Sequence, residues 1–212
     1  MAHSIYPWNV LLKIRWIAFK DLIGGLGFWG AIQVGWKVDC AERRGEPWEE
    51  MEPPSSPEEA ASREQAGGAI LLYRELCRRI GDERGLALTR TIILDSSVPW
   101  MRYAVGPLDA VQYRQLSPEG RKSLVQEKSR SFFNMTIDSI HAEEDGAGFV
   151  VRHCRFPELC QAVGVPQLAP LFCEVDAHYF GGVEPSLVLS REETLAAGGK
   201  SCPFVFHFND SR

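Results

Sequence analysis

The spacing of hydrophobic residues changes near residue 131 of this chain. Before this point, apolar side chains recur at three- and four-residue steps, for example over residues 5–38, as they do in amphipathic helices. After it, the runs FFNMTIDSI and GFVVRHCRF are rich in residues that favour strands, and Asp145-Gly146 between them is a strong hairpin signal. This change predicts an α+β fold, with N-terminal helices packed on a small antiparallel sheet that carries a helical insertion.

Capping signals locate the helices that precede the sheet. The stretch SSPEE can start a helix and Gly81 can end it, so we expect a helix over Pro57–Ile80. The segment GLALTRTIILD is expected to be helical and to lead into an irregular stretch at 96–116. A further capped helix is expected at 117–130.

Prolines and glycines divide the rest of the chain. Two short helices are expected at 157–163 and 170–180, because each follows a proline that suits a first helical turn. The segment PSLVLSREETLAAGGKSCPFVFHF then predicts a hairpin that turns at Gly198-Gly199.

Length and composition are those of an ordinary globular protein. The chain has 212 residues, of which 45% are apolar and 24% charged, and this length supports one hydrophobic core. We expect a single domain made of a helical N-terminal segment, an exposed linker rich in proline, glutamate and serine, a helical region and a β-rich region, at 1–45, 46–57, 58–130 and 131–212.

Charge and hydropathy argue against nucleic acid and against a membrane span. The net charge is −5, and no cluster of basic residues marks a surface that would attract a phosphate backbone. The charge-free run Leu22–Trp36 has 15 residues, short of the roughly 20 that cross a bilayer. Because the cysteines are dispersed and no export signal is evident, we expect reduced thiols in a cytoplasmic protein.

The N-terminal segment leaves several interpretations open. Its tryptophans could touch a membrane surface, but a buried pair of helices is the favoured interpretation. Exposure of Trp8, Trp16 and Trp29 would instead favour docking on a partner. The large apolar share of the segment is also compatible with a homodimer.

The string GLGFWG at residues 25–30 matches the glycine pattern of dinucleotide-binding turns. That pattern requires a preceding strand, whereas the residues before it, with Lys20 and Asp21, are typical of an amphipathic helix. We therefore interpret these glycines as positions where helices or a turn pack closely.

The chain has six cysteines, and their spacing indicates neither a metal site nor a cofactor. They are Cys40, Cys77, Cys154, Cys160, Cys173 and Cys202. The last four are separated by five, twelve and twenty-eight residues, and no CxxC pair occurs. For any single one of them, an ordinary buried thiol is the favoured interpretation.

The segment CEVDAHYF carries the most constrained group of reactive side chains. In a helix opened by Pro170, Cys173 and Asp176 lie three residues apart and therefore on one face. The positive end of the helix favours a Cys173 thiolate, whereas the nearby carboxylate disfavours it. The pair suits a carboxylate base beside a thiol as well as it suits a cysteine nucleophile.

The last third of the chain resembles the L-2-amino-thiazoline-4-carboxylic acid hydrolase family, and the helix containing GGAILLYRELCRRIGDERG resembles it more loosely. The pattern is a cysteine after a strand, a Cys-x-x-Asp helix, an arginine leading into TLAxG, and a cysteine followed by alternating aromatics. It falls on Cys154, Cys173, Asp176, Arg191, Thr194, Leu195, Ala196, Gly198, Cys202 and Phe204. The C-terminal pattern also resembles, more distantly, the four-vinyl-reductase small-molecule-binding domain. Gly199-Lys200-Ser201 and Pro203 depart from the pattern of the hydrolase family, whose members usually have acidic residues after the glycine and after the last cysteine. These departures leave the substrate open.

The resemblance implies a reaction and roles for five residues. Water attacks the carbon between the ring nitrogen and sulfur of a cyclic amidine, and the thiolate leaves to give an N-carbamoyl cysteine. Asp176 is implied as general base or water-positioning group, and Cys173 as nucleophile or as a thiol that shapes the pocket. Arg191 is implied to bind a substrate carboxylate, with a surface ion pair to a neighbouring glutamate as the alternative. Cys154 and Cys202 line the pocket or pack in the core.

Two functions are expected from these observations. The first is a hydrolase-like enzyme that acts on a small heterocyclic or cyclic-amidine metabolite by ring opening or by a related ring-forming or isomerising step. The second is a non-catalytic module that binds a small molecule in the same cysteine-lined pocket.

Overall fold

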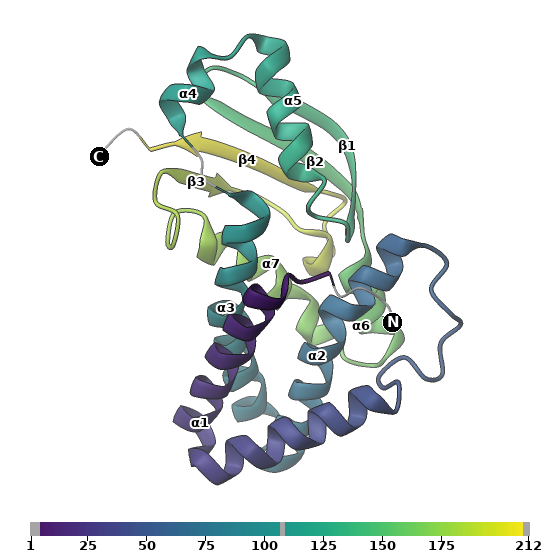
Figure 1. Ribbon diagram of the computed structural model, residues 1–212. Helices are drawn as coiled ribbons and strands as arrows, with labels where there is room; N and C mark the ends of the chain where they lie inside the picture. Colours follow the sequence, from purple (N-terminus) through teal and green to yellow (C-terminus); the bar gives the residue numbers. More distant parts are fainter. Residues whose placement is uncertain (1–4, 107–108, 210–212) are drawn as a thin grey trace.

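The computed structural model describes residues 5–106 and 109–209, and helices precede strands as expected. Figure 1 shows the long N-terminal helices in the lower half of the molecule and the sheet in the upper half. The long helices are α1 (Trp8–Arg43), α2 (Pro57–Ile80) and α3 (Asp82–Val105). The prediction of an α+β fold is confirmed, while residues 1–4 of the expected N-terminal segment lie outside the described residues.

Helix α1 bends at Gly27, where a φ of 72° and a ψ of 169° leave the helical region. Glycine adopts a positive φ without a steric penalty, so it permits this bend within an otherwise continuous helix. At Gly25 the backbone lies so close to α3 that an added Cβ would be 2.6 Å from the side chain of Leu88. The glycines therefore serve a bend and close helix packing, and helix rather than strand precedes them.

The expectation of a buried N-terminal helical pair is wrong for the tryptophans. Those of α1 are each at least 66% exposed: Trp8, Trp16, Trp29 and Trp36. Smaller side chains such as Leu22, Ala31 and Val34 form the buried face of α1, against Leu72 of α2 and Ile92 of α3. In the described part of the chain, no helix combines the length and the apolarity that a bilayer crossing demands.

Helix α2 has the bounds that its capping signals predicted. The Ser56 hydroxyl accepts a hydrogen bond from the backbone N–H of Glu59 at 3.1 Å, which satisfies a donor of the first turn. Gly81 follows the last turn with a φ of 84°. The linker before α2 is exposed over 52–55, but it is anchored where Trp48 lies 5.8 Å from the guanidinium of Arg63.

Helix α3 is longer than the sequence indicated, because it continues through Pro99 to Val105 where an irregular stretch was expected. Proline removes one backbone donor and usually ends or kinks a helix. Here Trp100 and Met101 are buried immediately after it, and their packing offsets that loss. Pro107 and Leu108 of the same stretch lie outside the described residues, and α4 (Ala110–Gln115) follows them.

The described strands form one four-stranded antiparallel sheet in the order β1-β2-β4-β3. They are β1 (Met135–Ala142), β2 (Gly146–Cys154), β3 (Leu187–Ser190) and β4 (Cys202–Phe208), and the first two form the predicted hairpin. Phe149 of β2 and Phe204 of β4 are register partners whose buried rings stack with centroids 4.7 Å apart. Helix α5 (Pro118–Ser129) packs against β1.

Two helices connect β2 to β3 and form the predicted insertion. They are α6 (Arg155–Ala162), which contacts α2, and α7 (Ala169–Tyr179), which contacts α3. Just beyond α7, the ring of Phe180 meets that of Phe206 in β4 at 4.8 Å. Helix α7 therefore lies between the long helices and the sheet, at the junction seen in Figure 1.

Candidate active site

The fold brings the five predicted site residues together. Cys154 ends β2 and Cys202 begins its neighbour β4, while Arg191 directly follows β3 on the other side of β4. Because these strands are antiparallel, the three residues reach the same end of the sheet. Cys173 and Asp176 of α7 join them there, and all five residues line one cavity.

Asp176 and Arg191 form a largely buried ion pair. Nη1 of Arg191 donates to Oδ2 of Asp176 at 3.0 Å, and the two side chains are only 9% and 14% exposed for the arginine and the aspartate. Nη2 of Arg191 donates to the backbone carbonyl of Cys173 at 2.6 Å, and the guanidinium lies 4.8 Å from the ring centroid of Phe204. Arg191 thus pairs with the candidate base rather than with an adjacent surface glutamate.

The surroundings of Asp176 suit proton transfer near neutral pH. Burial raises the pKa of this carboxyl to about 6, while the charge of Arg191 and its hydrogen bond act in the opposite direction. At neutral pH the carboxylate is therefore mostly ionised, and it can still take up a proton. Such a group meets the requirement for a general base.

The thiols of the site are neutral at physiological pH. Burial raises the pKa of Cys173 to about 12 and that of Cys154 to about 11, and it also raises the pKa of Cys202. Of the two opposing effects expected on the Cys173 thiol, that of the nearby carboxylate has the observed direction, although burial is the larger cause. Cys173 lies in the second turn of α7, where loss of hydration outweighs the charge of Arg191.

Hydrogen-bond donors orient two of these sulfur atoms. The Cys202 Sγ accepts from the backbone N–H of Leu195 at 3.1 Å, and the Cys154 Sγ accepts from Nδ2 of Asn134 at 3.5 Å. Leu195 begins the short 3-10 helix η2 (Leu195–Ala197), which Thr194 of the TLA motif caps. Within the described ranges, no three histidine, cysteine or acidic side chains are grouped to hold a metal ion.

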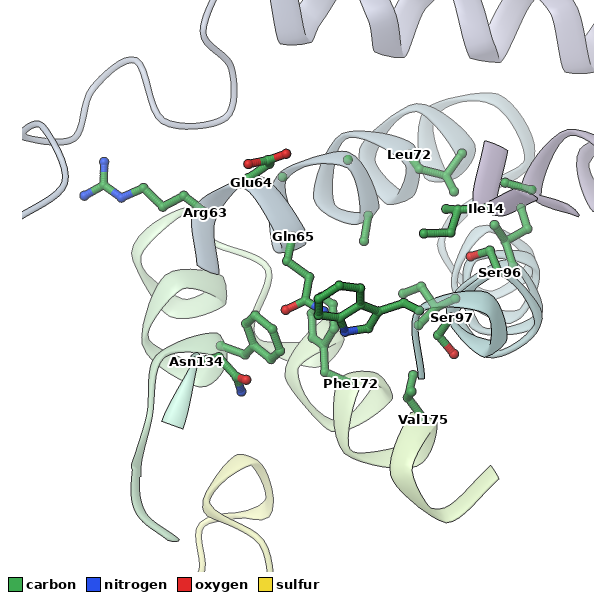
Figure 2. Close-up of a pocket in the computed structure, with 18 of the residues that line it drawn as sticks. Ile14, Arg63, Glu64, Gln65, Leu72, Ser96, Ser97, Asn134, Phe172 and Val175 are labelled. Atoms are coloured by element: carbon green, nitrogen blue, oxygen red, sulfur yellow. The ribbon is translucent and has the colours of Figure 1, made fainter. Parts of the chain in front are cut away.

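The cavity has a volume of about 930 Å³, which lies within the range of roughly 300–1,000 Å³ typical of small-molecule sites. Figure 2 shows Phe172 and Val175 of α7 on one side of it and Leu72 of α2 on the other, with the side chain of Gln65 extending between them. Apolar side chains supply most of the wall. The lining also includes the exposed Glu42, so the cavity reaches the surface.

Sequence reasoning missed several residues of this wall, among them Asn134, Gln65, Ser97 and Trp100. Asn134 is a buried polar residue in a run that was interpreted only for its strand propensity. For Trp100 a signal existed, because the helical spacing of Ile93, Trp100 and Ala104 continues across the proline. No local pattern marks Gln65, whose position depends on how α2 meets α7.

The fold and the site define an α+β protein with a cavity of small-molecule size. Helices and one end of a sheet form its wall, which carries a buried carboxylate, a guanidinium and thiols. The chain belongs to the L-2-amino-thiazoline-4-carboxylic acid hydrolase family, whose model matches residues 61–206, more than half of its length. The match is longer than the resemblance seen in the last third, since it also includes most of α2 and all of α3. Comparisons with curated proteins and with solved structures find no match.

Proposed function

We propose that this protein is a hydrolase that opens a small heterocyclic, cyclic-amidine substrate, with Asp176 as the general base. The observation that carries the proposal is the buried Asp176–Arg191 pair on the wall of a cavity of about 930 Å³. Membership of a family named for hydrolysis of a thiazoline carboxylic acid supports the same reaction class. The setting we propose is cytoplasmic, in keeping with the free thiols.

The proposed step consumes one water molecule. The water oxygen attacks the carbon between the ring nitrogen and sulfur, and Asp176 accepts a proton from this water as it attacks. The carbon–sulfur bond then breaks, and the water oxygen becomes the carbonyl oxygen of a carbamoyl group. Of the two water hydrogens, one ends on the sulfur as a thiol and one on the former ring nitrogen, so atoms and charges balance.

Arg191 has two tasks in this proposal. Its positive charge keeps Asp176 ionised at neutral pH despite burial. Its hydrogen bonds to Asp176 and to the Cys173 carbonyl use two of the five N–H groups of a guanidinium. The remaining donors are suited to the carboxylate of a substrate.

The thiols of Cys173, Cys154 and Cys202 are proposed to shape the cavity rather than to attack the substrate. A thiol with a pKa of about 12, as at Cys173, holds very little thiolate at neutral pH. Neutral thiols are weak hydrogen-bond donors and small apolar groups, suited to packing against the ring and sulfur of a thiazoline.

The direct test is to incubate the full chain with L-2-amino-thiazoline-4-carboxylic acid and a panel of related cyclic amidines. Mass spectrometry then follows formation of the ring-opened carbamoyl thiol. We expect turnover of at least one member of the panel, lost in Asp176→Asn and retained in Glu192→Gln, which removes an exposed carboxylate beside Arg191. Equal rates in the wild type and in Asp176→Asn would refute the role of Asp176.

A non-catalytic binding module is the second candidate, and one observation favours it. Asp176 already has an ionic partner, so the pair could serve only to hold α7 on the sheet. In that case, members of the panel would bind, as measured by calorimetry, without any ring-opened product. Cys173→Ser would then weaken binding and change no rate.

A further inference from the structure

The outer face of α1 exposes large apolar side chains that the fold does not use. Trp8, Leu12 and Trp16 follow one another at four-residue steps before the bend at Gly27, and all three are exposed. Phe28, Ile32 and Trp36 repeat this spacing after the bend, and Trp29 lies beside them. Residues four apart share one side of a helix, so each arm of α1 carries an apolar stripe that faces away from the core.

The exposed charged residues on the outer part of α1 all have the same sign. The exposed charged residues between positions 8 and 36 are Lys13, Arg15 and Lys20, all basic. Asp21 is the single acidic residue in this range, and it is half-buried. Arg15 also lines the cavity, where its charge acts on Glu42, so Lys13 and Lys20 are the basic residues of the outer face. The whole chain has 28 acidic residues and a net charge of −5, so an apolar face with only basic charges is a marked departure from the rest of the sequence.

We propose that the outer face of α1 binds an anionic membrane surface, with both arms lying along the headgroup region. Tryptophan suits this location, because its ring is largely apolar and its N–H can bond to water or to headgroups. Lysine and arginine beside such rings can bury their aliphatic stems and reach the lipid phosphates. The attachment is peripheral.

Charge also decides between a membrane and a second copy of the chain. In a two-fold dimer the same patch meets itself, so Lys13 and Lys20 would approach their own copies. No exposed acidic residue lies between positions 8 and 36 to pair with them. An anionic lipid surface supplies the opposite charge that a second copy of this face lacks.

The test is co-sedimentation of the full chain with vesicles of phosphatidylcholine alone and of phosphatidylcholine mixed with phosphatidylserine. We expect binding to the mixed vesicles, a blue shift of tryptophan fluorescence and weaker binding as salt is added. Each paired variant, Trp8→Ala with Trp16→Ala and Trp29→Ala with Trp36→Ala, should lower the partition coefficient by about tenfold or more. Lys13→Gln with Lys20→Gln should abolish the preference for phosphatidylserine.

Tyr103→Ala is the matched control, because Tyr103 is a large exposed aromatic residue outside α1. It should leave vesicle binding unchanged, and circular dichroism should show that every variant is folded. Absence of binding to both kinds of vesicle would overturn the proposal. So would self-association measured by light scattering, if the tryptophan variants abolish it and no vesicle binding occurs. Neither result affects the proposed chemistry at Asp176, which is measured in solution without lipid.

Discussion

Helix α1 and the junction of α7 with β4 both depart from the usual burial of side chains. Large apolar residues are exposed on α1, and charged residues are buried at the junction. On α1, Trp8 and Trp16 are exposed although tryptophan is normally well buried. At the junction, Asp176 and Arg191 are almost enclosed although charged residues are normally exposed. Neither arrangement follows from the burial of apolar surface that drives folding, so each points to a requirement other than folding.

The two regions also differ in whether the fold supplies a partner for their unusual side chains. The carboxylate of Asp176 has a guanidinium at 3.0 Å, a partner that the fold provides. The tryptophans of α1 have no comparable cover, because the buried face of this helix is made by Leu22, Ala31 and Val34. The junction is therefore complete within one chain, and the outer face of α1 is completed by something outside it.

Removing the buried carboxylate should have the largest effect on function. In Asp176→Asn, kcat/KM for a turned-over substrate should fall by about 100- to 10,000-fold, the range attributed to a general base. Steady-state kinetics on the variant and on Glu192→Gln measure the difference. If both variants lose activity equally, the comparison between a buried and an exposed carboxylate fails.

The thiols sharpen the same comparison. Burial raises the pKa of Cys173 from 9.0 to about 12, so its thiolate population at neutral pH should be about 1,000-fold smaller than that of an ordinary thiol. Iodoacetamide labelling with mass mapping should therefore modify Cys173 slowly at neutral pH and much faster as the pH rises. Rapid, selective labelling of Cys173 at neutral pH would restore the nucleophile hypothesis.

A pair of tryptophan substitutions compares the two regions in terms of stability. Trp100→Ala removes a buried ring from α3 and should lower the free energy of unfolding by about 3 kcal/mol or more. Trp16→Ala removes an exposed ring and should change it by less than about 0.5 kcal/mol. Urea denaturation of both variants gives the two values, and a similar loss in each would mean that α1 is packed more tightly than its exposure indicates.

The pH profile should show the smallest effect. A general base must be ionised, so kcat/KM should fall as the pH drops through about 6, the raised pKa of Asp176. Arg191→Gln removes the charge that lowers this pKa, so the midpoint of the acidic limb should move upward by roughly one unit or more. Arg191→Lys keeps the charge and should move it less. An unshifted profile in Arg191→Gln would assign the limb to another group.

Features of the fold that depend on residues close together in the sequence were predictable. The bounds of α2 follow from the cap at Ser56 and the glycine at 81, and the β1-β2 hairpin follows from Asp145-Gly146. Helix α3 was predicted too short, because Pro99 argues locally for a break. The burial of Trp100 and Met101, which outweighs that argument, exists only once α3 has packed.

The candidate site was predictable as a set of residues but not as an arrangement. Spacing within CEVDAHYF placed Cys173 and Asp176 on one face, and the family resemblance added Arg191, Cys154 and Cys202. That Arg191 would pair with Asp176 could not be derived, because β3 and α7 meet only in the folded chain. The sequence left the direction of the Cys173 pKa shift open for the same reason, since loss of hydration, its largest cause, is a tertiary property.

The range matched by the family model begins at residue 61, after the whole of α1, yet Leu11, Ile14 and Phe19 of α1 form part of the cavity wall. The residues proposed to carry the chemistry and part of the cavity wall thus come from separate stretches of the chain. Replacing α1 with a different helix would keep Asp176 and Arg191 in place and change the shape of the cavity, and so the substrates that fit it. Selectivity in this protein can therefore diverge without any change to Asp176 and Arg191, the residues proposed to act on the substrate.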